Sequence, residues 1–351
     1  MKIKQVTFEQ LDLKLSEPYT IAYETIAHTT NFILKIVTSS GLTGFGCAAP
    51  DVVVTLESPA QAKESIENIL IPFLLGKNAM MSVQILEELK TLLPTSSSVL
   101  AMTDMALLDL KSRKMDVPLY QFLGGYRHSI PTSMTIGILT VEDTLKAAAA
   151  YHKQGFFILK VKGGLSVDED VEKMIRIREL YPDMVLRFDG NQGYSVEQAL
   201  RFLKQAKAAK IELFEQPTAV GKDHNMGQIT HRTATPVMAD ESLKNLEDAF
   251  RLAQNSRINM VNIKLMKVGG IREAMHINSV AKSAGFEAMV GCIDECALGI
   301  SAGLHFALSR ANIKYADLDG HLDILDDPFS GIFSLKKGVL YPSEAPGLGV
   351  L

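Results

Sequence analysis

The chain has 351 residues, of which 47% are hydrophobic and 22% charged, a composition typical of a globular protein that excludes a mainly disordered chain. At roughly 150 residues a domain, this length predicts about two domains. Thirty-six Lys and Arg residues against 40 Asp and Glu residues give a formal net charge of −4. Binding to a phosphate backbone requires a basic excess, so we expect no nucleic-acid partner.

The cysteine content and the lack of long apolar runs predict a cytoplasmic protein. Cys47, Cys292 and Cys296 are too scattered for a disulfide framework, and an odd count is typical of a reducing compartment. The N-terminal segment lacks the apolar core of a secretory signal, and no run of about 18 apolar residues occurs. We therefore expect neither secretion nor a membrane span.

The first third of the chain predicts an α+β unit. Residues 1 to about 50 show strand patterning, with leucines alternating with polar residues over 11–16. From Ser58 the pattern becomes helical, because Ser58 is a favourable N-cap and Pro59 suits the first helical position. We expect an antiparallel sheet followed by helices, together forming a domain of residues 1–125.

After Pro131, short β-branched or aromatic runs alternate with amphipathic helices. The runs cover residues 132–137, 156–162, 184–189, 211–215, 236–240, 259–264, 286–291 and 313–317. Their last residues follow one another at intervals of 24 to 27 residues. This even spacing favours a parallel α/β barrel over the alternative, an open doubly wound sheet. We expect the barrel to span residues 126–321 and residues 322–351 to return across the first domain.

Carboxylates end three consecutive strands of this predicted barrel, at Asp189, Glu215 and Asp240. The active site of a parallel barrel forms at the C-terminal ends of its strands. A strand-terminal Asp can simply be solvated or cap the next helix. Three carboxylates in one barrel mouth, however, repel one another unless a cation lies between them. Hard oxygen donors without His or Cys nearby favour Mg²⁺, so we expect these three residues to bind one Mg²⁺ ion.

Lysines end the second and sixth predicted strands. Lys160 and Lys162 point into the barrel together because strand side chains alternate between faces. The sixth strand lies across the barrel, so Lys264 approaches a substrate from the face opposite to Lys162, as inversion of a carbon centre requires. A nearby Mg²⁺ and a second ammonium lower the pKa of a lysine, which favours a neutral base near about pH 7. We predict acid/base roles for Lys162 and Lys264, with Lys160 in support.

Five motifs resemble those of the enolase superfamily, in its muconate-lactonizing-enzyme subgroup. In chain order they are FILKVKGG, RFDGNQGY, ELFEQP, PVMADES and NIKLMKVGGI, and the resemblance covers essentially the whole chain. It implies a modified TIM barrel of the (β/α)7β type with an N-terminal α+β capping domain. It also implies the same metal and lysine roles as the charges at the strand ends.

The segment after the eighth strand distinguishes among the activities of this subgroup. Asp317 and Asp319 resemble the Asp-x-Asp signature of dipeptide epimerases, in which the carboxylates hold the substrate's free α-ammonium. An anionic pair needs a cationic partner, which muconate and succinylbenzoate do not offer. The alternative is that the pair only caps the turn after this strand. We also expect Asp294 and Glu295, after the seventh strand, to help position the substrate.

An early loop departs from the pattern of L-Ala-D/L-Glu epimerases. The resemblance implies a loop arginine that pairs with the substrate's glutamate, but the first arginine of the chain is Arg113 and this loop carries Glu24. Glu24 would repel a glutamyl side chain, so we predict dipeptides whose second residue is apolar or basic. Ile21, Tyr23 and Ile26 are candidates for an apolar lid or, alternatively, for anchors of the loop on the barrel.

These inferences predict an isomerase, a Mg²⁺-dependent dipeptide epimerase. It would invert the α-carbon of the second residue by a two-base 1,1-proton transfer through an enediolate. Two alternatives stay open: an o-succinylbenzoate synthase or N-acylamino acid racemase of the same subgroup, and a barrel that has lost catalysis and serves as a scaffold. The expected partner is a small dipeptide, and the sequence is compatible with a homo-oligomer.

Overall fold

Three antiparallel strands begin the chain and form a meander. They are β1 (Ile3–Thr20), β2 (Thr25–Thr38) and β3 (Thr43–Ala48), paired in the order β1-β2-β3. The computed structural model describes residues 1–20, 25–255 and 258–351. The antiparallel sheet predicted from the alternating leucines is confirmed.

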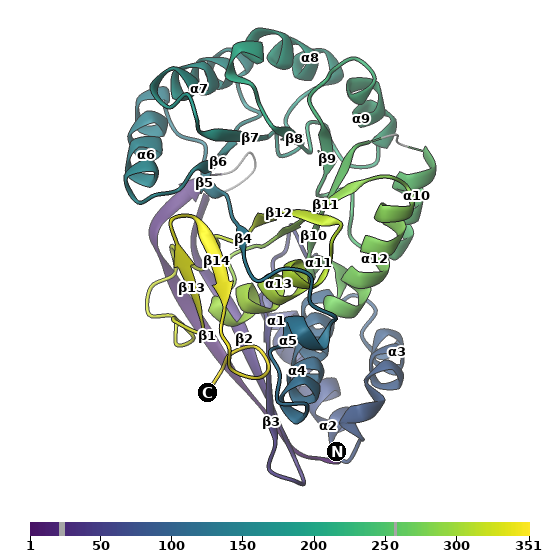
Figure 1. Cartoon of the computed structure of the whole chain (residues 1–351). Helices are drawn as coiled ribbons and strands as arrows, with labels where there is room; N and C mark the ends of the chain where they lie inside the picture. Colours follow the sequence, from purple (N-terminus) through teal and green to yellow (C-terminus); the bar gives the residue numbers. More distant parts are fainter. Residues whose placement is uncertain (21–24, 256–257) are drawn as a thin grey trace.

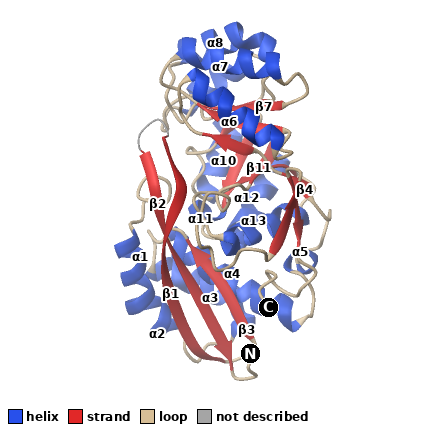
Figure 2. Cartoon of the chain, turned by 90° about the vertical axis from the view of Figure 1, so that its left-hand side faces the viewer, coloured by secondary structure: helices blue, strands red, loops and turns tan. Residues whose placement is uncertain are grey.

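Helices pack against one side of this meander (Figure 2). They are α1 (Pro59–Ser65), the π-helical η1 (Ile66–Leu70), α2 (Ile71–Leu74), the 3-10 turn η2 (Ala79–Met81), α3 (Ser82–Leu92), α4 (Ser97–Lys114) and α5 (Leu119–Phe122). The side chain of Ser58 accepts a hydrogen bond from the Gln61 N–H, which confirms the predicted N-cap. α4 packs so closely on β3 that a Cβ atom at Gly46 would lie 1.9 Å from the Met102 carbonyl oxygen. Only glycine fits there.

Eight parallel strands form the second sheet, in sequential order from β5 to β12. They are β5 (Met134–Ile136), β6 (Ile158–Lys162), β7 (Val185–Asp189), β8 (Leu213–Glu215), β9 (Val237–Ala239), β10 (Met260–Lys264), β11 (Glu287–Gly291) and β12 (Ile313–Asp317). Thr132, just before β5, bridges to Ala316 of β12, and the Ser133 N–H donates to the Ala316 carbonyl at 3.2 Å. The sheet therefore closes into a barrel.

Helices follow each of the first seven barrel strands and surround the sheet (Figure 1). They are α6 (Val141–Lys153), α7 (Val167–Leu180), α8 (Val196–Gln205) with η3 (Ala206–Ala209), α9 (Asp223–Thr230), α10 (Leu246–Asn255), α11 (Leu265–Val268) with α12 (Ile271–Ser283), and α13 (Ala297–Ser309). The (β/α)7β prediction is confirmed, and the open doubly wound sheet is wrong.

Apolar side chains fill the inside of the barrel below its charged end. Leu213, Met238, Met260 and Met289 form a buried cluster there, contributed by four successive strands. The barrel is therefore a packed core rather than a pore, and a substrate can enter only at the C-terminal ends of the strands.

The C-terminal segment runs back over the first domain. β13 (Phe333–Lys336) and β14 (Val339–Pro342) form a small sheet with β4 (Ile130–Pro131). Farther on, the Leu348 N–H donates to Asp109 of α4 at 2.7 Å. The predicted return thus contacts the first domain, whereas the domain boundaries at residues 125 and 321 stay predictions.

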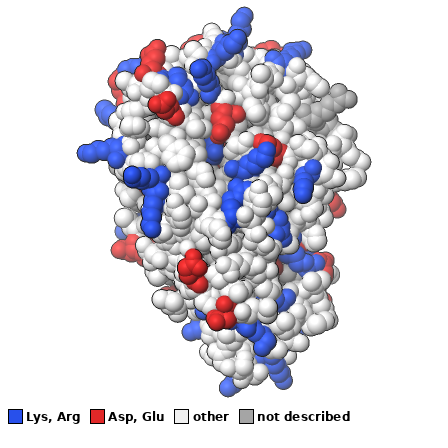
Figure 3. Space-filling model, in the orientation of Figure 1, with Lys and Arg blue, Asp and Glu red and all other residues white. Residues whose placement is uncertain are grey.

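Acidic and basic side chains share the molecular face drawn in Figure 3, over both the barrel and the first domain. No helix in the described part of the chain is long and apolar enough to cross a membrane. The cytoplasmic location, the absence of a nucleic-acid partner and the oligomeric state stay predictions.

Candidate active site

The three carboxylates predicted to bind a metal lie at the C-terminal ends of adjacent strands. Asp189 of β7 stands opposite Glu215 of β8 in the sheet register, and Asp240 directly follows β9, the next strand. All three side chains are buried. Their mutual approach depends on the parallel register, because each strand contributes its last polar residue to the same rim.

Lys160 lies among buried carboxylates at this rim. Its Nζ atom is 2.8 Å from Glu215 Oε2, 3.1 Å from Asp189 Oδ2 and 2.8 Å from Asp317 Oδ2. Burial lowers the pKa of Lys160, but these carboxylates raise it more, so the net pKa lies well above its usual value. Lys160 is therefore a fixed positive charge rather than a proton acceptor.

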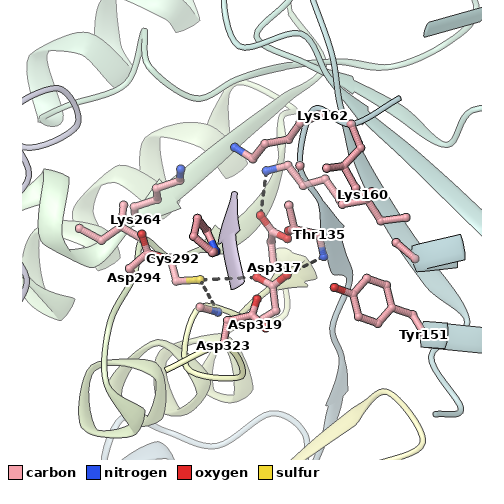
Figure 4. A pocket seen from close by; sticks show the side chains of 17 residues that line it. Thr135, Tyr151, Lys160, Lys162, Lys264, Cys292, Asp294, Asp317, Asp319 and Asp323 are labelled. Carbon is pink, nitrogen blue, oxygen red and sulfur yellow. Dashed lines mark hydrogen bonds and ion pairs between the residues drawn. The ribbon is translucent and has the colours of Figure 1, made fainter. Parts of the chain in front are cut away.

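Lys162 and Lys264 approach one cavity from different sides (Figure 4). Their strands, β6 and β10, are separated by three strands in one direction around the barrel and by three in the other. The Lys162 ammonium donates to Asn191 Oδ1 at 3.2 Å, and the Lys264 ammonium is 2.9 Å from Asp240 Oδ2. Any substrate atom bound between them would have one amine on each face.

The electrostatic surroundings of Lys264 differ from the sequence-based expectation. Burial lowers the pKa of Lys264, but Asp240, with Glu215 and Glu241, raises it more, so the pKa lies above its usual value. The expected lowering assumed a neighbouring Mg²⁺ ion and the Lys160 ammonium. Of the protein groups around Lys264, the carboxylates raise its pKa more than the Lys160 ammonium lowers it. A lowered pKa of Lys264 therefore depends on a bound Mg²⁺ ion.

Asp317 and Asp319 line the same cavity but have different surroundings. Asp317 accepts hydrogen bonds from Ser133 Oγ at 2.6 Å and Lys160 Nζ at 2.8 Å; burial raises its pKa, but Lys160 lowers it to about 2. Asp319 accepts the Thr135 N–H at 2.7 Å, and burial together with Asp317 raises the pKa of Asp319 to about 7. Asp317 is thus already neutralised by the protein, whereas Asp319 is short of positive charge.

The loop after β11 is held from the capping domain. Asp294 lines the cavity, and its carbonyl oxygen accepts from Thr29 Oγ1 at 2.9 Å and from Asn31 Nδ2 at 3.1 Å. The other end of the buried Asn31 amide accepts the Cys296 N–H at 2.8 Å. One side chain of β2 therefore fixes the backbone on both sides of residue 295.

Glu295 and Glu24 were also predicted to contact the substrate. The prediction for Glu295 is not supported, because its side chain is buried against the start of α13, accepts the Ile293 N–H at 3.2 Å and does not line the cavity. Burial raises the pKa of Glu295 to about 8, as expected for a carboxyl group away from solvent. Glu24, together with Ile21 and Tyr23, lies outside the described residues.

Two buried amides that the sequence analysis did not single out hold the carboxylates in place. Asn262 Nδ2 donates to Glu215 Oε1 at 2.7 Å. Gln216 Oε1 accepts the Asp240 N–H at 2.9 Å, while its Nε2 donates to the Thr218 carbonyl. Strand alternation alone could have revealed Asn262, because it lies two residues before Lys264 on the same face.

Two charged residues that were not predicted to belong to the site, Lys267 and Glu241, also lie near Asp240. Lys267 is buried and pairs with the carboxylate and the carbonyl oxygen of Asp240. Glu241 accepts from Asn191 Nδ2 at 3.3 Å, and burial, with Asp240 and Asp189, raises the pKa of Glu241 to about 7. The sequence could have indicated Lys267 as a site residue, because it lies one helical turn after Lys264.

The carboxylate oxygens at this rim suit a hard divalent cation, although each of the three carboxylates forms an ion pair with a lysine. Over residues 1–20, 25–255 and 258–351, no three His, Cys, Asp or Glu side chains form a ready-made metal cluster. Asp189 Oδ2 and Glu215 Oε2 are nevertheless buried and accept no hydrogen bond from the described residues. Both form ion pairs with Lys160, and Asp189 Oδ2 also lies 3.5 Å from Lys162 Nζ. Oxygen donors of this kind, on three adjacent strands, suit Mg²⁺.

Acids and amines lie at the strand ends of a (β/α)7β barrel beneath an α+β cap, which is where TIM-barrel enzymes have their active sites. Residues 143–351 match the family described as Enolase C-terminal domain-like, and residues 3–124 match the Mandelate racemase / muconate lactonizing enzyme, N-terminal domain. The chain therefore belongs to the mandelate racemase and muconate-lactonizing-enzyme group of the enolase superfamily. The resemblance noted from its motifs is confirmed.

Several relatives match the whole chain. The L-Lys-D/L-Arg epimerase of Desulforapulum autotrophicum is 40% identical over 100% of this chain and 99% of its own. A substrate-liganded complex of the L-Ala-D/L-Glu epimerase from Bacillus subtilis superposes with a TM-score of 0.97 at 35% identity, covering 100% of this chain and 99% of that one. The dipeptide epimerase from Enterococcus faecalis, complexed with Mg and L-Leu-L-Tyr, gives 0.96 at 36% identity, covering 99% of both chains. These relatives are isomerases, the predicted enzyme class, but their names give different side-chain preferences.

Proposed function

We propose that this protein is a Mg²⁺-dependent dipeptide epimerase that inverts the α-carbon of the second residue. The observation that carries the proposal is one cavity lined by Lys162 and Lys264 from opposite strands and by the Asp317–Asp319 pair. The amines supply opposed proton carriers, and the acids supply a site for a free amino terminus. Asp189, Glu215 and Asp240 would hold the metal.

The proton transfer requires two amines in different protonation states. One of Lys162 and Lys264, neutral at Nζ, takes the α-proton, and the electron pair of the broken C–H bond delocalises into the substrate carboxylate. The other lysine, as an ammonium, returns a proton from the opposite face to complete the inversion. General acid/base catalysis contributes about 10²- to 10⁴-fold. Bound Mg²⁺ would supply the larger part, by stabilising negative charge on that carboxylate.

The amino terminus of the substrate would bind at Asp319. Asp317 is already engaged by Lys160 and Ser133, whereas the contacts of Asp319 among the described residues come from neutral groups of Thr135 and from Cys292 Sγ at 3.8 Å. A substrate ammonium would satisfy this buried carboxylate with a charge-assisted hydrogen bond. Asp317 then acts chiefly by holding Lys160 in place.

We further propose that the second residue of the substrate is apolar or basic. Asp294 and Ile293 border the cavity on the Lys264 side, and its described lining contains no arginine or histidine. The lysines in the lining, Lys160, Lys162 and Lys264, already lie beside carboxylates. An acidic side chain would therefore meet a carboxylate without a matching cation. The role of Glu24 in this preference stays a prediction.

Comparing a free dipeptide with its N-acetylated form tests the proposed function. We expect kcat/KM to be at least about 30-fold higher for L-Ala-L-Leu than for N-acetyl-L-Ala-L-Leu, because the acetyl group removes the charge that satisfies Asp319. The Asp319→Asn variant should lose most of this difference. Equal rates on both substrates would overturn the dipeptide proposal and favour an N-acylamino acid racemase.

The raised pKa of Asp319 predicts a pH dependence in dipeptide binding. Below about pH 7 the Asp319 carboxyl takes up a proton and loses its attraction for an ammonium. The ratio of Kd values for the N-acetylated and free dipeptides should therefore fall as the pH drops from 8 to 5.5, measured by titration calorimetry with Mg²⁺ present. Using the ratio cancels ionisations of the lysines. A ratio that does not change with pH would contradict this role.

A further inference from the structure

We propose that Asn31, a residue of the capping domain that does not line the cavity, positions Asp319 to bind the amino terminus of the substrate. The inference rests on the proposed function, because it takes the α-ammonium of the substrate to bind at Asp319. Asn31 lies on β2 and Asp319 follows β12, so the effect has to pass through the loop after β11, residues 292–296.

The side chain of Asn31 is completely buried, and both ends of its amide are engaged. Its Nδ2 atom donates to the Asp294 carbonyl and to Thr29 Oγ1, each at 3.1 Å, while its Oδ1 atom accepts the Cys296 N–H at 2.8 Å. Only an amide offers a donor and an acceptor at these two ends. Because β2 is paired with β1 on one side and β3 on the other, Asn31 ties the loop to the centre of the meander.

The loop in turn packs against the segment that carries Asp319. Cys292 Sγ accepts the Gly320 N–H at 3.3 Å and lies 3.8 Å from Asp319 Oδ1 (Figure 4). A Cβ atom at Gly320 would lie 2.2 Å from the Ile293 carbonyl oxygen, so the two segments meet backbone to backbone. A shift of the loop therefore either moves Asp319 or opens a gap beside it.

Asp319 is held from two directions that differ in origin. Its Oδ2 atom accepts the Thr135 N–H of β5, a contact made within the barrel, whereas its Oδ1 atom faces the loop that the capping domain holds. A charge-assisted hydrogen bond needs a short distance and good alignment, and a displacement of about 1 Å can cost about 10²-fold in rate. The capping domain thereby influences a carboxylate that Asn31 does not itself touch.

The ratio of kcat/KM for L-Ala-L-Leu to that for N-acetyl-L-Ala-L-Leu tests the inference. This ratio reports on ammonium binding at Asp319, whereas a general loss of folded enzyme lowers both values equally. In the full-length enzyme with Mg²⁺, Asn31→Ala should lower the ratio from at least about 30-fold to below about fivefold, mainly through the free dipeptide. Thr29→Val removes the Thr29 Oγ1 donor to the Asp294 carbonyl but keeps Asn31, so it should lower the ratio by about threefold.

Thr38→Val is the matched control for these variants. Thr38 is also a buried polar residue of β2, and its hydroxyl donates to the Leu42 carbonyl at 3.1 Å, but it is the last residue of the strand and has no contact with the loop after β11. This variant should keep the ratio of the unaltered enzyme. An unchanged ratio in Asn31→Ala or Thr29→Val, or an equal fall in Thr38→Val, would overturn the inference.

Amide hydrogen exchange read by mass spectrometry tests the same path without a substrate. Asn31→Ala should speed the exchange of the Cys296 N–H, which Asn31 holds, and also that of the Gly320 N–H, which it does not touch. Faster exchange at Cys296 alone would show that the loop does not transmit the change, and would overturn the inference. Failure of the unaltered enzyme to epimerise the free dipeptide would instead overturn the proposed function.

Discussion

Replacing Lys264 by alanine should stop epimerisation but leave hydrogen exchange at the α-carbon of one stereoisomer. Lys162 reaches the cavity from β6, across the barrel from Lys264 of β10, so it can still remove and return a proton on its own face. Inversion also needs the opposite face, so its rate should fall by about 10²- to 10⁴-fold. Proton NMR in D₂O measures exchange, and chiral chromatography measures inversion.

The complementary variant makes the test stringent. Lys162→Ala should exchange only the stereoisomer that Lys264→Ala leaves untouched. Lys282→Ala serves as the matched control, because Lys282 is exposed on α12, and it should epimerise at the normal rate. If both stereoisomers still exchange in Lys264→Ala, the two amines do not serve opposite faces of the substrate.

The sequence predicted the barrel closely because its signal is local and repeated. Six of the eight strands end at the predicted residue, and β5 and β9 each end one residue earlier, at Ile136 and Ala239. Each strand is a short apolar run bounded by a charged or glycine residue, so its end is visible without any tertiary information. Parallel pairing then brings those ends to one rim.

The residues that the sequence did not reveal act through contacts distant in the chain. Asn31 of the capping domain holds residues 294 and 296 of the barrel, and no local pattern marks a buried amide of this kind. Gln216, which directly follows the preceding strand β8, supports Asp240. Whether a loop residue such as Glu295 faces the cavity or α13 depends likewise on how the capping domain holds the loop.

Metal removal should give the other large effect. With EDTA present, we expect α-proton exchange and epimerisation to fall by about 10³-fold or more, because the charge that develops on the substrate carboxylate then lacks its main stabilisation. Excess Mg²⁺ should restore both. Full activity in the metal-free protein would contradict the role given to Asp189, Glu215 and Asp240.

Thermal unfolding separates loss of the metal from loss of the fold. Lysines already neutralise the carboxylates, with Lys160 against Asp189 and Glu215 and Lys264 against Asp240, so the metal-free protein should remain folded. Mg²⁺ that binds only the native state stabilises it by RT ln(1 + [Mg²⁺]/Kd), so tighter binding gives a larger rise in Tm. Glu215→Gln keeps the acceptor for Asn262 but removes one anionic donor, so Mg²⁺ should raise the Tm of this variant much less than that of the unaltered protein. An equal rise in both proteins would place the bound Mg²⁺ elsewhere, because a site built on Glu215 cannot keep its affinity when that charge is lost.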